Sequence, residues 1–367
     1  MKKVLLLLSG GVALCLVSVA LFGFYIYKSF SSVPPTDAKA AVVYELLPGK
    51  SFLQVSSDLQ ELGLVKNAMM FNLYARFKNQ REKIKVGEYE LFTNMTPQQV
   101  LSVITSGKSV ARPITISEGL NIYDIAALLE NKKLCTQAEF FKLVRDPELI
   151  QSLLGPEAKT FQIKSLEGYL FPETYLLTKY MGTKELVTQM VKRFLANWEM
   201  IEKQVAYPAI KLSRHERVTL ASIIEKETSA PQERKLISSV FHNRLEQGMR
   251  LQTDPTILYG LAEMSGQMVM SITKADLTRP NKYNTYMNYG LPPGPIANPG
   301  ALALQAAFEP EETDYLFFVS QNNGTHVFSE NYKDHQAAVQ KFQMDPKARE
   351  GKSWRDLNNP PPNTTKQ

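Results

Sequence analysis

An uncharged apolar run near the start of the chain limits its structure more than any other feature. Lys2 and Lys3 precede this run, which covers residues 4–27 and ends on Tyr25 and Tyr27. At about 1.5 Å per residue, a helix of this length can cross a hydrocarbon core about 30 Å thick. We therefore expect a single transmembrane helix over residues 4–27 that anchors the rest of the chain.

A cleaved signal peptide is the alternative, because Ser18-Val19-Ala20 fits a small-x-small cleavage pattern. We favour a retained helix, since the apolar run continues to Tyr27 and aromatic residues are typical of a helix end at the membrane interface. Positive charges before the helix favour a cytoplasmic N-terminus. The residues that follow the helix are then expected outside the cytoplasm.

The composition favours ordered globular domains behind this anchor. With 367 residues, of which 44% are apolar and 21% charged, the chain is long enough for two such domains. The net charge of +6 comes from scattered Lys and Arg residues, which is typical of a solvated surface and argues against nucleic-acid binding. Outside the apolar run Cys135 is the only cysteine, so no intrachain disulfide is expected.

A small α+β module is predicted over residues 41–110, in the order strand, helix, helix, strand. Pro48-Gly49 predicts a turn after the first strand, and Asn67 can cap the second helix. One apolar face is predicted on that helix, formed by Met70, Leu73, Tyr74 and Phe77. The order of elements resembles a LysM-type module, a fold associated with binding glycans that contain GlcNAc. A purely structural arm fits the same spacing.

A weak internal repeat at an offset of 70 residues predicts a second small helical module over residues 111–154. Residues 28–40, which include Pro34-Pro35, are expected to form a linker, and residues 346–367 a flexible tail. Residues 155–345 predict a larger mixed α/β domain, so the expected fold class is α+β. The repeat pairs Gly49, Phe52, Val55, Leu59, Leu64 and Phe71 with Gly119, Ile122, Ile125, Leu129, Leu134 and Phe141.

Two glutamates in the sequence ASIIEKET, residues 221–228, lie on a predicted helix that is otherwise mostly apolar. At about 100° per residue, Glu227 falls in the middle of the apolar stripe and Glu225 falls on the opposite side of the helix. Burial in such a stripe raises the pKa of a carboxyl group, which is what a general acid needs near neutral pH. Glu227 is therefore the predicted catalytic acid, with an interior salt bridge as the structural alternative.

A helix break is predicted directly after these glutamates, and a polar loop is predicted further along the chain. Ser229 and Gln232 resemble a capping box, and Pro231 suits the first turn of a new helix. Further on, Asp254 is expected to lie in a polar loop, because Pro255 disfavours helical geometry at the residue before it. The helix break predicts that Glu227 can face a cleft instead of a packed helix interface, and Gln252, Thr253 and Asp254 of the polar loop can hydrogen-bond sugar hydroxyls or amides.

Three later segments have distinct patterns. Residues 283–286 (YNTY) combine aromatic faces with amide and hydroxyl groups, the mixture that carbohydrate binding needs. Residues 290–296 are rich in proline and predict a stiff wall. Residues 315–320 and 326–329 predict a β-hairpin with a structural role, with its turn at Asn323-Gly324.

Several motifs in one order resemble the MltG/YceG family of endolytic murein transglycosylases. The resemblance covers nearly the whole chain and implies cleavage of the β-1,4 bond between MurNAc and GlcNAc in bacterial peptidoglycan. The MurNAc 6-hydroxyl would attack C1 and leave a 1,6-anhydro end, with Glu227, the second glutamate of the E-K-E triplet, as acid and then base. The motifs are EGYLFPETY (167–175), ASIIEKET (221–228), VFHNRL (240–245), GMRLQTDPTILY (248–259), YNTY (283–286), GLPP (290–293) and NPG (298–300).

The same motifs supply candidates for substrate binding and imply the surroundings of the enzyme. No cofactor is expected, and the four histidines lack metal-ligand spacing. The expected partners are peptidoglycan glycan strands and peptidoglycan synthases, at the bacterial inner membrane with the catalytic domain in the periplasm; termination of nascent strands is a further expectation. The substrate-binding candidates are Glu167, Tyr169, Asn243, Gln252, Asp254, Asn284 and Tyr286.

Other functions remain open from the sequence alone. A hydrolase would fit the same acid, because nothing in the residue pattern excludes water as the nucleophile. A non-catalytic scaffold that binds the wall through the tandem small modules is a second alternative. A lyase acting on a small metabolite is a third, against which the predicted anchor argues.

Overall fold

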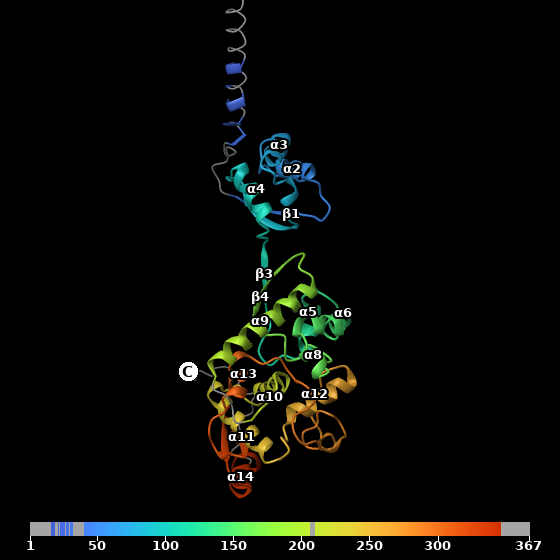
Figure 1. The fold of residues 1–367 in the computed structure, drawn as a ribbon, viewed down its shortest axis with the longest axis vertical. Coiled ribbons are helices and arrows are strands. Elements are labelled where there is room, and N and C mark those ends of the chain that lie inside the picture. Colours follow the sequence, from blue (N-terminus) through green and yellow to red (C-terminus); the bar gives the residue numbers. More distant parts are fainter. Residues whose placement is uncertain are drawn as a thin grey trace, which may run out of the picture. The chain divides into compact units, whose positions relative to one another are not determined.

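The computed structural model describes residues 16–18, 21, 23–25, 27–28, 30–31, 40–205 and 210–345. These residues divide into two compact units. The first contains the residues up to Pro113 together with Leu176–Met181, and the second contains Ile114–Tyr175 and the residues from Gly182 onward. Figure 1 shows helices and short strands in both units, so the expected α+β class is confirmed.

Much of the predicted transmembrane run, residues 4–27, lies outside the described residues, as does the predicted tail, residues 346–367. The described residues of the run are helical. Within the described part of the chain, no helix is both long enough and apolar enough to cross a membrane. The anchor therefore stays a prediction.

The first unit contains a pair of antiparallel strands, β1 (Ala41–Leu46) and β2 (Gly87–Phe92). Ala41 lies opposite Phe92, and Leu46 lies opposite Gly87. Helices α2 (Phe52–Glu61) and α3 (Ala68–Phe77) and a 3-10 turn (Arg81–Lys83) lie between the strands in sequence, and α4 (Pro97–Ser106) follows them. The strand, helix, helix, strand order expected for this segment is therefore present.

Local capping explains where the helices of this unit begin. Ser51 and Gln54 form a capping box at the start of α2, and the Asn67 side chain accepts a hydrogen bond from the Met70 amide at the start of α3, as predicted. Each cap is worth about 1 kcal/mol because it satisfies backbone amides that have no partner inside the helix.

The apolar face predicted for α3 is partly wrong. Phe71 and Ala75 are fully buried, whereas Leu73 and Phe77 are 57% and 82% exposed. Phe71 packs against the ring of Phe52 on α2, with 5.5 Å between ring centroids. Apolar residues occur on every side of this ten-residue helix, so spacing alone did not select the face that packs against α2.

The next segment of the chain again places helices between two paired strands in sequence. Strand β3 (Ala111–Thr115) pairs with β4 (Thr174–Thr178). Between them lie α5 (Ile122–Asn131), α6 (Gln137–Val144), α7 (Pro147–Leu154) and α8 (Glu157–Thr160). Helices α2 and α5 both contain ten residues, and each begins three residues after a left-handed glycine. The second small helical module over residues 111–154 stays a prediction.

A group of helices forms the interior of the second unit. The long helix α9 (Thr183–Gln204) packs against α13 (Ala301–Phe308), and α10 (Arg214–Glu227) packs against α11 (Arg234–Glu246), α12 (Asp254–Ser265) and α13. Figure 1 shows α10 among these helices. Every residue from Arg217 to Ile224 is buried, so α10 is enclosed on all sides instead of having a solvent-facing side.

The predicted hairpin forms near the end of the described part of the chain. Strand β5 (Phe317–Ser320) pairs antiparallel with β6 (His326–Ser329), and Asn323-Gly324 lies in the turn, as expected. Helix α14 (Tyr332–Val339) packs on both strands and continues into a π-helical turn (Gln340–Met344). A 3-10 turn (Asp276–Thr278) lies between α12 and α13.

Two local predictions near α10 are wrong. The Ser229 and Gln232 capping box does not form; a 3-10 turn (Pro231–Glu233) with no side-chain cap leads into α11 instead, although Pro231 does lie in its first turn. Asp254 is the first residue of α12, not part of a loop, with Pro255 in the first turn. Proline is tolerated there because the first helical amides have no partner inside the helix.

Candidate active site

Glu227 is the last residue of α10, and its side chain lies at the wall of a cavity of about 370 Å³. The Thr253 hydroxyl donates a hydrogen bond to the Glu227 carboxylate. Residues from α10, α11, the start of α12 and the hairpin region meet at this cavity. Its lining consists of Glu227, Arg244, Leu251, Gln252, Thr253, Asp254, Tyr286, Phe317, Phe318, Tyr332 and His335.

The environment of Glu227 raises its pKa from 4.5 to about 7. Burial is the largest cause, because it disfavours the charged form, and the nearby negative charge of Asp254 raises the pKa further. The Thr253 hydrogen bond and the Arg244 charge act in the opposite direction. Near neutral pH the carboxyl group can therefore exist in both forms, which allows it to donate a proton and to take one back.

The position of Thr253 is set by a network of threonines. The backbone amide of Thr253 donates to the Thr285 hydroxyl at 3.0 Å, and the hydroxyls of Thr256 and Thr285 lie 2.9 Å apart. Before Thr253, Gln252 has a left-handed backbone with φ of 52°, which is uncommon for a residue other than glycine. This turn directs the Thr253 hydroxyl toward Glu227.

Arg244 supplies a buried positive charge beside the cavity. Its Nε donates to the Leu316 carbonyl at 2.7 Å, and its Nη1 donates to the Leu251 carbonyl at 2.9 Å. The guanidinium also lies over the Phe317 ring, 5.2 Å from its centroid. Arg244 therefore links the start of the hairpin to the loop before α12, and so holds two walls of the cavity together.

Asp254 and Tyr286 meet at the other side of the cavity. The Tyr286 hydroxyl donates to Asp254 Oδ1 at 2.7 Å. As the first residue of α12, Asp254 also lies where the helix dipole favours a negative charge. The charge of Asp254 contributes to the raised pKa of Glu227.

Glu225 has a different environment, although it is only two residues away. Its side chain is 5% exposed and pairs with Arg234 at 2.9 Å, and it accepts a hydrogen bond from the Gly300 amide at 3.0 Å. The helical wheel therefore separated the two glutamates correctly, but the side that carries Glu225 is not exposed to solvent. Because α10 is enclosed on all sides, the charge of Glu225 is met by Arg234 instead of water.

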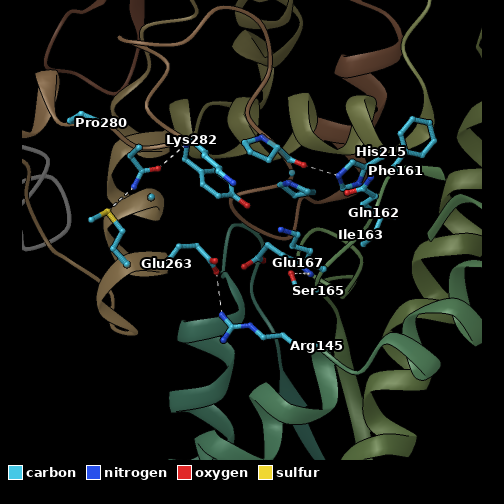
Figure 2. Close-up of a pocket in the computed structure, with 18 residues that line it drawn as sticks. Arg145, Phe161, Gln162, Ile163, Ser165, Glu167, His215, Glu263, Pro280 and Lys282 are labelled. Atoms are coloured by element: carbon cyan, nitrogen blue, oxygen red, sulfur yellow. Dashed lines mark hydrogen bonds and ion pairs between the residues drawn. The ribbon is translucent and has the colours of Figure 1, made fainter. Parts of the chain in front are cut away.

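Glu167 and Tyr169 do not line the cavity at Glu227. Glu167 is buried and accepts hydrogen bonds from the Ile122 amide at 2.9 Å and from Asn298 Nδ2 at 3.0 Å. Burial raises the pKa of Glu167 to about 8. Tyr169 is also buried, with its hydroxyl 2.8 Å from His215 Nδ1. Glu167 and His215 belong to a second cavity, shown in Figure 2.

The two candidate asparagines bind backbone groups. Asn243 Nδ2 donates to the Thr313 carbonyl at 2.7 Å and to the Tyr315 carbonyl at 2.9 Å. Asn284 is fully buried. Its Nδ2 lies within hydrogen-bond distance of the carbonyls of Asp276, Leu277 and Arg279. These amides hold loops, and a role toward substrate stays a prediction for both. Gln252, Asp254 and Tyr286 do lie at the Glu227 cavity.

Sequence reasoning missed the contribution of the C-terminal part to this cavity. Phe317, Tyr332 and His335 line it, although the hairpin was expected to be purely structural. His335 stacks on Phe317 with 5.1 Å between ring centroids, and burial lowers its pKa. No local pattern marks these residues, because their proximity to Glu227 depends on how the hairpin and α14 pack in space.

A partly buried glutamate whose pKa lies near neutrality, at the wall of a polar and aromatic cavity, defines a class of protein: an enzyme that uses general acid–base catalysis. The comparisons with known proteins name the family. Residues 44–341 match the model of the YceG-like family, so the chain belongs to that family. The resemblance inferred from the motifs is confirmed.

Relatives and a solved structure agree with this assignment. A Bacillus subtilis protein named endolytic murein transglycosylase is 32% identical over 87% of this chain and 90% of its own length. A Streptococcus pneumoniae protein of the same name is 30% identical over 86% of this chain, and the chain spans 62% of that relative. A crystal structure of a putative yceG-like protein from Listeria monocytogenes has a TM-score of 0.53 at 34% identity, covering 82% of this chain and 100% of that one.

Proposed function

We propose that the chain is an endolytic murein transglycosylase that cuts glycan strands of peptidoglycan at the β-1,4 bond between MurNAc and GlcNAc. The observation that carries the proposal is the Glu227 carboxyl group, held at the cavity wall with a pKa raised to about 7. The names of the relatives support the substrate class.

The reaction uses one carboxyl group twice. Protonated Glu227 donates its proton to the glycosidic oxygen as the bond from that oxygen to C1 of MurNAc breaks. The Glu227 carboxylate then accepts the proton of the MurNAc 6-hydroxyl while the oxygen of this hydroxyl bonds to C1. The products are a free GlcNAc hydroxyl on one fragment and a 1,6-anhydroMurNAc end on the other, and no water is consumed.

Thr253 and Asp254 have supporting roles in this scheme. The Thr253 hydroxyl fixes the direction of the Glu227 carboxyl group and stabilises its charged form. Asp254 raises the pKa of Glu227 and is itself held by the Tyr286 hydroxyl. An ordinary glycosidase uses a second carboxyl group as nucleophile or base, whereas the 6-hydroxyl of the substrate supplies the nucleophile here.

The N-terminal part sets the location in this proposal. Residues 4–27 anchor the chain in the inner membrane, residues 28–40 act as a linker, and residues 41–110 form a LysM-like module that binds the glycan. Residues 155–345 catalyse the reaction in the periplasm. The uncharged run, the lysines before it and the order of elements in the first unit support this arrangement. At that position the enzyme can meet peptidoglycan synthases and terminate nascent strands.

Product analysis tests the proposal. The purified full chain, incubated with glycan strands, should release fragments with 1,6-anhydro ends that mass spectrometry identifies. Glu227→Gln keeps the shape of the side chain and removes the proton donor, so the rate should fall at least about 100-fold. Fragments with only reducing ends would identify a hydrolase. Glycan binding by the wild type without any shortening of the strands would favour the scaffold alternative.

A further inference from the structure

A second and larger cavity lies in the same unit as the catalytic cavity. Its volume is about 710 Å³, compared with about 370 Å³ for the cavity at Glu227. The segments 161–167, 280–283 and 293–295 form its walls together with part of α12. Figure 2 shows Glu167 within it, between the Arg145–Glu263 ion pair and the neighbouring rings of Phe161 and His215. The proposed reaction assigns no role to this cavity.

The charged groups at this cavity favour a ligand that carries carboxylates. Lys164 and Lys282 line it, are exposed, and have no ion pair within the described residues. Arg145 lines it as well and pairs with Glu263 at 3.2 Å. Burial keeps the pKa of Glu167 at about 8, so this carboxyl group is mostly uncharged at pH 7. The lining is therefore net positive at neutral pH.

The remaining walls offer ring surfaces and space. Tyr283 packs against Tyr259 with 4.9 Å between ring centroids, on the wall formed with α12. Gly260 on α12 leaves room for Asn281, since a Cβ atom at this glycine would lie 2.6 Å from Asn281 Oδ1. Apolar ring faces beside cationic groups suit a short peptide that has small apolar side chains and free carboxylates.

Helix α12 and the loop 283–286 each have residues at both this cavity and the catalytic one. Helix α12 begins with Asp254 at the catalytic cavity and reaches Glu263 at the second cavity. This separation along the helix is roughly 14 Å at 1.5 Å per residue. The loop 283–286 has Tyr283 at the second cavity and Tyr286 at the catalytic one. One polymer can therefore contact both cavities only if it extends or branches over this distance.

We propose that the second cavity binds an acidic peptide stem of the peptidoglycan strand while Glu227 acts on the sugar backbone. The stems branch from MurNAc and carry carboxylates and alanine methyl groups, so they match the cationic and ring-lined walls. This inference rests on the proposed function for its substrate. It makes the cavity a specificity site that favours strands with stems over bare glycan.

A paired-substrate experiment tests this inference with the full chain. Cleavage is measured on strands that carry stems and on the same strands after an amidase has removed the stems. The wild type should cut the strands with stems about 3- to 10-fold faster in kcat/KM, the range that two partly exposed charge contacts can supply. Lys164→Gln/Lys282→Gln should lose this preference and keep the rate on bare strands. The preference should also shrink at high salt.

The matched control is Lys142→Gln/Lys192→Gln, which removes two exposed lysines of α6 and α9 that line neither cavity. This control should keep the preference. Equal wild-type rates on the two substrates would overturn the inference and leave the proposed function intact. An equal loss on both substrates in Lys164→Gln/Lys282→Gln would also overturn it.

A separate readout keeps the test decisive if the chain cuts neither substrate. Free stem peptide, released from peptidoglycan by the amidase, is titrated into the full chain by calorimetry. Binding to the wild type that weakens at least about threefold in the double variant supports the cavity as a stem site even if the proposed reaction is wrong. Absence of binding to the wild type would overturn the inference.

Discussion

Glu225 and Glu227 are two residues apart at the end of α10, and they are held by different parts of the second unit. Glu225 pairs with Arg234 at 2.9 Å and accepts from the Gly300 amide, whereas Glu227 accepts from the Thr253 hydroxyl at the cavity wall. The pKa of Glu227 is raised to about 7. One helix end therefore carries a glutamate held in a buried ion pair and a glutamate whose pKa is raised.

Glu225→Gln should destabilise the protein and leave Glu227, the proposed acid, in place. The change leaves Arg234, which is 6% exposed, with a weaker partner, because Glu118 lies farther away at 3.4 Å. Breaking one side of a buried ion pair costs about 3–5 kcal/mol, and the remaining contact with Glu118 should reduce the loss to about 2–3 kcal/mol. Urea unfolding measures this loss, and the activity per folded molecule should change less than about threefold.

Glu199→Gln is the matched control for that variant. Glu199 pairs with Lys203 at 2.6 Å, but both side chains are largely exposed. Such a pair on a helix surface contributes about 0.3–0.5 kcal/mol, so stability should hardly change. Equal stability of Glu225→Gln and Glu199→Gln would contradict the structural role of Glu225.

The pH dependence of cleavage should have a basic limb near pH 7. The first step needs protonated Glu227, whose pKa is about 7, so kcat/KM should fall as pH rises above that value. Asp254→Asn removes a negative charge that raises this pKa, so the limb should move to lower pH. Thr253→Val removes a hydrogen bond that lowers this pKa, so the limb should move to higher pH.

Thr253→Ser is the control for the second shift, because it retains the hydroxyl group. Its basic limb should stay within about 0.3 pH units of the wild type, since the hydrogen bond to the carboxyl group is kept. A limb that stays at the same pH in both Thr253→Val and Asp254→Asn would mean that Glu227 is not the group observed in the profile.

Local features of this fold could be predicted from the sequence. The cap at Asn67, the turn at Pro48-Gly49 and the β5–β6 hairpin all follow from side chains that act within a few residues. Helical periodicity also separates Glu227 from Glu225, and the two have different partners in the structure. In each case the determining contacts are close in sequence.

The errors concern features that depend on packing over long distances in the sequence. The spacing on α3 predicted Leu73 and Phe77 as buried, but the position of α2 determines which side packs. Pro255 predicted that Asp254 would lie outside a helix, but Asp254 is the first residue of α12. The contribution of His335 to the cavity depends on α14 packing against the hairpin, which no local pattern encodes.

Glu227→Gln should increase stability at alkaline pH. The folded pKa of Glu227, about 7, exceeds its ordinary value of 4.5, so the wild type loses folding free energy as pH rises from about 4.5 through 7. Glutamine has no charge to desolvate, and its carbonyl can still accept from Thr253. The variant should therefore be about 1–3 kcal/mol more stable than wild type at pH 8 and equally stable at pH 4. Thermal unfolding at both pH values measures this, and an equal gain at pH 4 would contradict the burial argument.

Gly168→Ala should be more destabilising than its backbone conformation alone explains. Gly168 has φ of +84°, and a Cβ atom there would lie 2.5 Å from Pro295 and 2.9 Å from Val218 on α10. Gly248 also has a positive φ of +65°, but a Cβ atom there meets nothing within 4 Å. Gly248→Ala therefore measures the backbone cost, about 1–2 kcal/mol. Gly168→Ala adds the clash with Pro295, a ring that cannot rotate away, and should cost at least about 2 kcal/mol more in urea unfolding. If the two variants lose equal stability, the close approach of the proline-rich wall to residue 168 is not needed for the fold.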